Sequence, residues 1–167
     1  GYGAIIRDIR SEFPDLVISV STSGRNWPEF EKRADVLDLE GLEKPDMASL
    51  TLSSLNFNAE PSVNSPEMIQ SLALRMQERG IKPELEVFDA GMINQAKYLA
   101  RKGILNPPYY FNFILGNMAC AQADPLHLGV MIRDLPAGSV WSAGGVGRAQ
   151  LTVNVMALSA GGGVRIV

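Results

Sequence analysis

Short apolar runs alternate with helical patterns along most of the chain, and this repeat restricts the fold more than any other feature of the sequence. Six runs are predicted to be strands: residues 16–21, 46–50, 84–88, 109–115, 139–143 and a final run after the glycines at 161–163. They recur about every 25–35 residues, with helical patterns between them. Since the runs are mostly apolar throughout, they are typical of a parallel sheet buried on both faces. The repeat therefore predicts an α/β chain.

Small or polar residues at or near the ends of these runs favour a (β/α)8 TIM barrel over an open, doubly wound sheet. They are Ser21, Ser49, Glu86, Asp89, Gly116, Gly144 and Arg165. TIM barrels collect their chemistry at the carboxyl ends of all strands, whereas no dinucleotide-binding or Walker glycine motif occurs in the chain. We expect residues 1–167 to be a single domain, an incomplete barrel with the third to eighth of eight strands, truncated at both ends.

Start and stop signals delimit the helices between the strands. Ser65 is a predicted N-cap, Pro66 occupies the first turn after it, and Gly80 ends that helix. Asp124-Pro125 begins another helix that continues to Arg133. The remaining helices are predicted at residues 1–10, within 27–39, at 92–102 and at 148–159.

Composition excludes several classes of protein. With 46% hydrophobic residues and a net charge of −3, the chain can form a core but has no basic block for nucleic acid. No run reaches the roughly 18 apolar residues of a membrane span, and no secretory signal is evident, so we expect a cytoplasmic protein. The single cysteine, Cys120, excludes an internal disulfide, and the single histidine, His127, excludes a self-contained histidine-rich metal site.

Six stretches, taken together and in order, form a more specific pattern. They are Ser21-Thr22-Ser23-Gly24, KPDMASL at 44–50, SLNF at 54–57, KPELEVFDAGM at 82–92, WSAGGVGR at 141–148 and GGGVR at 161–165. In residues and spacing they resemble the β-keto acid cleavage enzymes, the family typified by 3-keto-5-aminohexanoate cleavage enzyme. The resemblance implies a (β/α)8 barrel that condenses a β-keto acid with acetyl-CoA, giving acetoacetate and a new CoA thioester.

The same resemblance implies roles for five residues. Ser21 and Gly24 match the turn that holds the substrate carboxylate, and Ser49 matches a substrate-binding hydroxyl position. Arg165 matches the arginine of the last strand, which would orient the base or neutralise developing charge. Glu86 matches an acidic position of the family, and we expect Arg165 and Glu86 to be catalytic.

A divalent metal, usually zinc, is also implied, together with acetyl-CoA as co-substrate and a homo-oligomer, by resemblance a tetramer. The histidine pair of the family lies before Gly1, and its Glu-Asp pair lies beyond Val167. Two further family histidines are here Ala149 and Gly163. We therefore expect residues 1–167 to hold no metal tightly.

Other interpretations of single residues stay open. Asp89 matches the acidic position as well as Glu86 does, or it caps the following helix. Glu86 alternates with apolar neighbours, so it should face the barrel interior and pair with Arg165. His127 is expected to be structural, Cys120 has no neighbouring base that would make it a nucleophile, and Arg25 is a candidate contact for CoA phosphates.

Two other functions also stay open. A metal-dependent barrel lyase or aldolase acting on a keto acid would differ in not requiring CoA. A catalytically inactive fragment or pseudo-enzyme would keep only the scaffold, and we expect no catalysis if the 167 residues are the whole protein.

Overall fold

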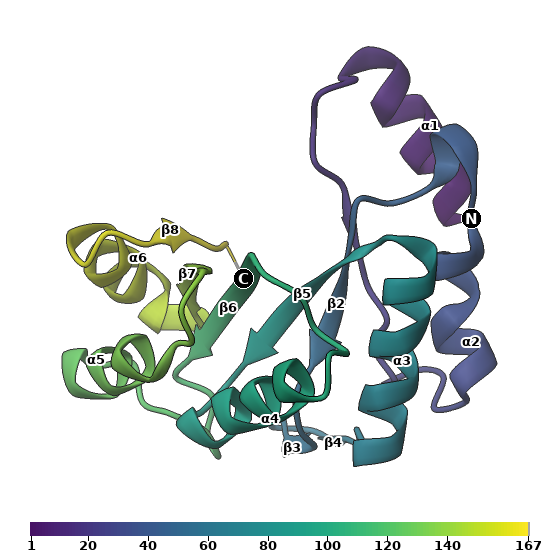
Figure 1. Ribbon diagram of the computed structural model, residues 1–167. Helices are drawn as coiled ribbons and strands as arrows, with labels where there is room; N and C mark the ends of the chain where they lie inside the picture. The colour runs from purple at the N-terminus through teal and green to yellow at the C-terminus, as the bar shows by residue number, and fades with distance from the viewer. Residues whose placement is uncertain (167) are drawn as a thin grey trace.

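Six parallel strands form one curled sheet in the computed structural model, which describes residues 1–166 (Figure 1). The sheet order is β1-β2-β5-β6-β7-β8, and every neighbouring pair is parallel. The strands are β1 (Ser19–Val20), β2 (Met47–Thr51), β5 (Lys82–Val87), β6 (Tyr109–Leu115), β7 (Ser139–Gly145) and β8 (Gly163–Val164). The prediction of a parallel sheet whose strands follow chain order is confirmed.

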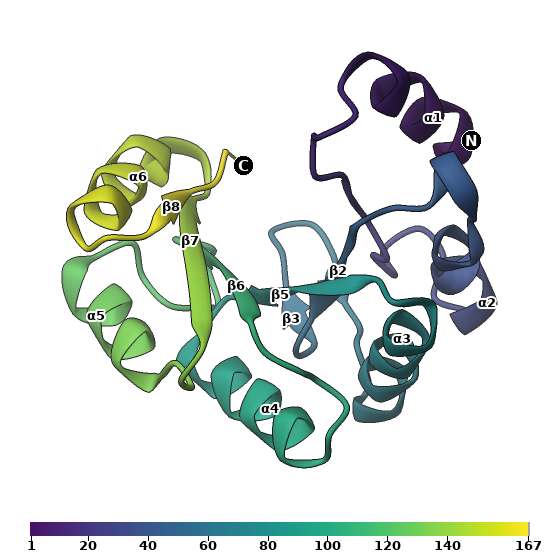
Figure 2. The same ribbon diagram turned by 45° about the horizontal axis from the view of Figure 1, so that its top comes forward.

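Helices surround the convex side of this sheet and leave its concave side open (Figure 2). They are α1 (Tyr2–Glu12), α2 (Phe30–Ala34), α3 (Pro66–Arg79), α4 (Ala90–Arg101), α5 (Pro125–Asp134) and α6 (Gln150–Ser159), with 3-10 turns at Asp35–Asp38, Gly41–Glu43 and Gly147–Ala149. A curled parallel sheet with helices on its outer side is part of a TIM barrel, as predicted. Within residues 1–166, no helix is long and apolar enough to cross a membrane.

Local sequence signals explain where the helices begin and end. Ser65, Asp89 and Asp124 each accept hydrogen bonds from backbone N–H groups in the first turn of α3, α4 and α5. Gly80 ends α3 in the left-handed conformation, with φ of 61°, which glycine adopts without a steric penalty. Asp89, which had two interpretations, is therefore a helix cap in this structure.

The apolar core lies on the helix-covered side of the sheet. Leu85 and Val87 of β5 and Phe111 and Phe113 of β6 are almost completely buried there. The Phe113 ring stacks on Trp141 of β7, with centroids 5.7 Å apart. Because successive side chains on a strand point to opposite faces, the residues between these apolar positions are turned to the open, concave side.

Two details differ from the sequence-based prediction. The first strand is only Ser19–Val20, and Leu16 and Val17 are exposed, because β1 lies at the sheet edge and pairs with β2 alone. The segment between β2 and α3, where no strand is predicted from the sequence, contains a separate antiparallel hairpin formed by β3 (Leu55–Asn56) and β4 (Pro61–Ser62). Two-residue strands carry too little periodicity to be recognised in the sequence.

Candidate active site

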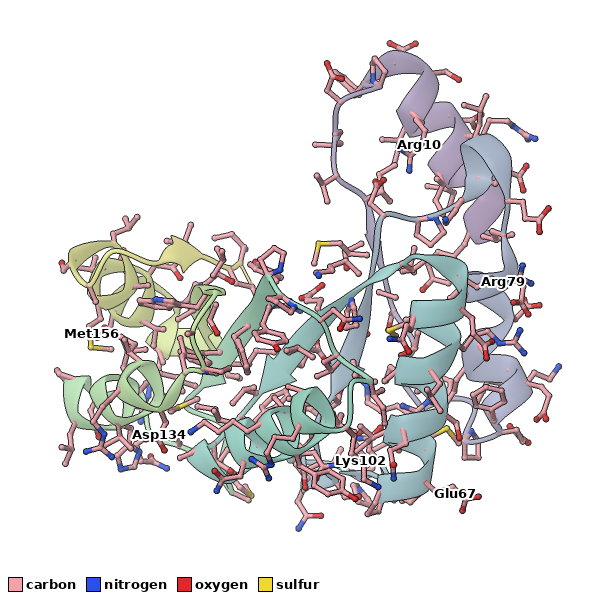
Figure 3. The ribbon with its side chains drawn as sticks, viewed as in Figure 1. Arg10, Glu67, Arg79, Lys102, Asp134 and Met156 are labelled. Carbon is pink, nitrogen blue, oxygen red and sulfur yellow. The ribbon has the colours of Figure 1, made fainter. Side chains whose placement is uncertain are left out.

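A cavity of about 510 Å³ opens on the concave face of the sheet. Four residues predicted from the sequence, Ser21, Ser49, Glu86 and Arg165, line it together. The other lining residues are Ser19, Val20, Ser23, Arg25, Thr51, Phe57, Ser62, Glu84, Phe88, Ile114 and Val146. Charged side chains such as Arg79, Lys102 and Asp134 belong instead to the outer helices or their ends (Figure 3). The curled sheet thus collects polar groups from distant parts of the chain on its inner side.

Arg165 and two glutamates form the charged centre of this cavity. Arg165 Nη1 donates a hydrogen bond to Glu84 Oε1, and Arg165 Nη2 lies 3.5 Å from Glu86 Oε1. The predicted contact between Glu86 and Arg165 is present, but the closer partner of Arg165 is Glu84. Sequence analysis missed Glu84, although its spacing of two residues from Glu86 on one strand was a signal that both face the same side.

Glu84 is held in place by several donors. Ser19 Oγ donates to Glu84 Oε2 at 2.6 Å, and Asn112 Nδ2 and Arg165 both donate to Oε1. Asn112 in turn accepts a hydrogen bond from Ser142 Oγ at 3.3 Å. Charge-assisted hydrogen bonds of this kind are stronger than neutral ones. Glu84 is therefore suited to fixing the position of Arg165.

The Glu86 carboxylate has fewer hydrogen-bond partners than that of Glu84. Thr51 Oγ1 donates to Glu86 Oε2 at 2.7 Å, and the contact from Arg165 to Oε1 is long. Burial raises the pKa of Glu86 above its usual value, and the contacts with Thr51 and Arg165 only partly offset that effect. A carboxyl group with a raised pKa can take up and release a proton closer to neutral pH.

The turn at residues 21–24 begins where β1 ends. Ser49 Oγ accepts a hydrogen bond from the Thr22 N–H at 3.1 Å, and Thr22 Oγ1 donates to the Ser49 carbonyl at 2.6 Å. Ser21 faces the cavity, whereas Gly24 does not line it. A Cβ atom at Gly24 would lie 2.7 Å from Arg33 Nη1, so Gly24 allows that guanidinium to pack against the turn.

Three other residues considered from the sequence lie outside the cavity lining: Asp89, Cys120 and His127. His127 Nδ1 accepts a hydrogen bond from the Gln122 backbone N–H at 2.6 Å, which is a structural role. Burial raises the pKa of the Cys120 thiol, which reduces the fraction of reactive thiolate. The geometry favours no chemical role for these side chains.

The described residues do not by themselves fit a zinc site. Within residues 1–166, no three His, Cys, Asp or Glu side chains are grouped so that they could hold a metal ion. Glu84 and Glu86 are the carboxylates of the cavity, and both contact Arg165. Catalytic zinc usually requires three protein ligands, so any such ion would depend on groups beyond these residues.

Comparison with known proteins identifies relatives along the whole chain. A family model described as beta-keto acid cleavage enzyme matches residues 1–166. The 3-keto-5-aminohexanoate cleavage enzyme of Fusobacterium nucleatum is 37% identical over 166 residues, covering 96% of this chain and 57% of the relative. The enzyme of the same name from Acetoanaerobium sticklandii is also 37% identical, over 95% of the chain and 57% of the relative.

A third relative carries a different name. The 3-oxoadipate:acetyl-CoA acetyltransferase of Cupriavidus necator is 33% identical over 98% of this chain and 57% of its own length. The chain therefore spans 57% of the length of each of these three relatives.

Proposed function

The chain belongs to the family of β-keto acid cleavage enzymes, and we propose that it supplies the substrate site of an enzyme that condenses a β-keto acid with acetyl-CoA. The products are acetoacetate and a new acyl-CoA. One observation carries the proposal: Arg165 and Glu86 share a cavity with the turn at residues 21–24. The name of the relative from C. necator, which includes acetyl-CoA, supports the choice of co-substrate.

The net reaction transfers the acyl group of the β-keto acid to CoA and joins the remaining carboxymethyl unit to the acetyl group. Removal of a proton from the α-carbon of the β-keto acid generates a nucleophile, which forms a carbon–carbon bond to the thioester carbonyl and expels CoA thiolate. The thiolate then adds to the original ketone, the old carbon–carbon bond breaks, and acetoacetate leaves after its carbanion takes up a proton. The site must therefore hold a carboxylate, stabilise an enolate and move a proton.

The turn after β1 is suited to holding the substrate carboxylate. Ser21 presents a hydroxyl group to the cavity, with Ser49 supporting the turn from β2. Arg165 adds a positive charge on the same cavity, and its Nε is buried without a partner among residues 1–166. A guanidinium on the cavity wall suits an anionic substrate, because it can form charge-assisted hydrogen bonds with a carboxylate.

Glu86 is the proposed base. Its raised pKa suits a base, and it accepts one hydrogen bond, from Thr51, whereas the Glu84 carboxylate accepts three, from Ser19, Asn112 and Arg165. We assign Glu84 the role of positioning residue, since it fixes Arg165 beside Glu86. Arg165 would then stabilise negative charge that develops on the enolate oxygen.

Zinc remains part of the proposal as a Lewis acid that would polarise the ketone when bound. Its ligands would have to include groups outside residues 1–166, because these residues offer no suitable group of three side chains. A homo-oligomer, by resemblance a tetramer, and a cytoplasmic location complete the proposal.

The test is formation of acetoacetate by the purified protein supplied with zinc. The substrates are acetyl-CoA with 3-keto-5-aminohexanoate or 3-oxoadipate, the compounds in the names of the relatives. We expect acetoacetate only when both substrates are present. Cleavage of the keto acid without CoA would instead support a lyase or aldolase, and absence of any turnover would support an inactive scaffold.

Substitution of two arginines, one in the cavity and one on an outer helix, distinguishes an effect on the site from an effect on the fold. Arg165→Gln should abolish most of the activity, because it removes the cation between Glu84 and Glu86. Arg133→Gln is the matched control, since the Arg133 side chain on α5 is 74% exposed. Equal activity of the two variants would contradict the proposed role of Arg165.

A further inference from the structure

A second cavity, of about 650 Å³, adjoins the first. Ser21, Ser23 and Arg25 line both cavities, so the turn after β1 forms a shared wall. The other lining residues are Tyr2, Asn26, Trp27, Lys32, Arg33, Asp35, Val36 and Glu60. Small-molecule sites commonly have volumes of about 300–1,000 Å³, and the shared wall would let one long ligand occupy both cavities.

Cations outnumber carboxylates in the second cavity. Arg25, Lys32 and Arg33 face Asp35 and Glu60 there. Within residues 1–166, none of the three cations forms an ion pair with a carboxylate. The cavity therefore has positive groups available for an anion.

Arg33 is the most unusual of these cations because it is buried. It is only 5% exposed, and its hydrogen bonds go to the neutral oxygens of Thr22, Val63 and Asn64. Burial lowers the pKa of Arg33, since the charged form loses solvation. A buried charge without an opposite charge is expensive, so an anion in the adjoining cavity would offset that cost.

An exposed aromatic ring lies beside the cations. Trp27 is 58% exposed, and Lys32 Nζ lies 5.4 Å from its ring centroid. A large exposed indole can stack on a flat heteroaromatic ring, as aromatic side chains do on the bases of nucleic acids. The cavity thus combines a stacking surface with cations, which is the pair of features that a phosphorylated nucleoside requires.

We infer that the second cavity binds the phosphate-bearing nucleotide end of the CoA thioester, while the acyl end reaches the first cavity past Ser21 and Ser23. Trp27 would stack on the adenine ring, and Arg25, Lys32 and Arg33 would attract the phosphates. This inference rests on the proposed function, since it assigns a place to the co-substrate of that reaction.

The test measures binding of the nucleotide end alone, without turnover. Adenosine 3′,5′-bisphosphate is titrated into the protein by isothermal titration calorimetry. Quenching of tryptophan fluorescence that is lost in Trp27→Phe, a variant that keeps Trp141, locates the ligand. Lys32→Met should weaken binding about tenfold, the effect of losing one charge-assisted hydrogen bond. Lys102→Met is the matched control, because Lys102 makes the same kind of cation–π contact, 4.8 Å from the Tyr98 ring, away from both cavities.

The possible results distinguish failure of the nucleotide site from failure of the proposed function. Tight binding of the bisphosphate that is weakened by Lys32→Met and not by Lys102→Met would support the site, even if no acetoacetate is ever formed. Turnover of acetyl-CoA by a protein that does not bind the bisphosphate would overturn the site and leave the proposed function standing. Equal binding of inorganic phosphate would show a general anion site and would also overturn the assignment to a nucleotide.

Discussion

The two faces of strand β5 have opposite chemistry, although their residues alternate along a single short segment. Leu85 and Val87 are buried in the apolar core beneath the helices, whereas Glu84 and Glu86 face the cavity. Burial of an apolar side chain stabilises the fold, while partial burial of a carboxylate costs free energy unless it gains partners. The outer face of the strand therefore contributes mainly to the stability of the fold, and its inner face to the proposed chemistry. Substitutions on the outer face should lower stability, and substitutions on the inner face should lower activity.

The largest effect on activity is expected on the inner face. Glu86→Gln should lower the rate of acetoacetate formation about 10²–10⁴-fold, the usual contribution of a general base. Its unfolding free energy at pH 7 should not decrease, because a neutral amide costs less to bury than a carboxylate. Steady-state kinetics and urea unfolding measure both quantities, and a variant with full activity would exclude Glu86 as the base.

The largest effect on stability is expected on the outer face. Leu85→Ala should lower the unfolding free energy by about 2–5 kcal/mol, the cost of a cavity at a fully buried leucine. Activity per folded molecule should be retained, because Leu85 does not line the cavity. Urea unfolding followed by circular dichroism checks this, and a cost below 1 kcal/mol would mean that the face is not tightly packed.

Gly24 lies in the turn that packs against Arg33 and is proposed to hold the substrate carboxylate. Gly24→Ala should cost about 1–3 kcal/mol, because its Cβ would collide with the buried Arg33 guanidinium. Displacing the turn should also raise the KM for the β-keto acid. In the control Gly129→Ala, on α5, the new methyl group meets no atom within 4 Å, and a small gain in stability is expected.

Asp89 allows the cap and the acidic-site interpretations to be separated. Asp89→Ala should cost about 1 kcal/mol of stability through loss of the helix cap, as should Ser65→Ala at the start of α3. Both variants should keep their activity per folded molecule. Loss of activity in Asp89→Ala alone would move the acidic role from Glu86 to Asp89.

The smallest expected effect is a pH-dependent difference in stability. Because burial raises the folded-state pKa of Glu86, the folded chain keeps a proton that the unfolded chain releases above about pH 4.3. Its contribution to stability is present below that value and is lost as pH rises through the folded-state pKa. As pH rises from acid to neutral, the unfolding free energy of the unmodified protein should therefore fall relative to that of Glu86→Gln. The opposite trend would contradict the raised pKa.

Much of the fold follows from local patterns in the sequence. Strand β6 was predicted at Tyr109–Leu115 and is found there, and the cap at Ser65 and the end at Gly80 delimit α3 as expected. Strand β1 was predicted too long, because an apolar run at a sheet edge has few partners to hold it. The short hairpin of β3 and β4 has no comparable local signal.

The sequence by itself determined the order of strands and helices, the residues that begin α3 and α5, and the alternation that turns Glu86 to the inner face of its strand. These features depend on residues within a few positions of each other. Only the tertiary structure decided that Arg165 meets Glu84 across 81 positions of the chain and that Arg33 is buried against the turn at residues 21–24. Such contacts depend on the curvature of the sheet and on how its loops close, because two side chains far apart in sequence meet only when the whole intervening fold brings them together.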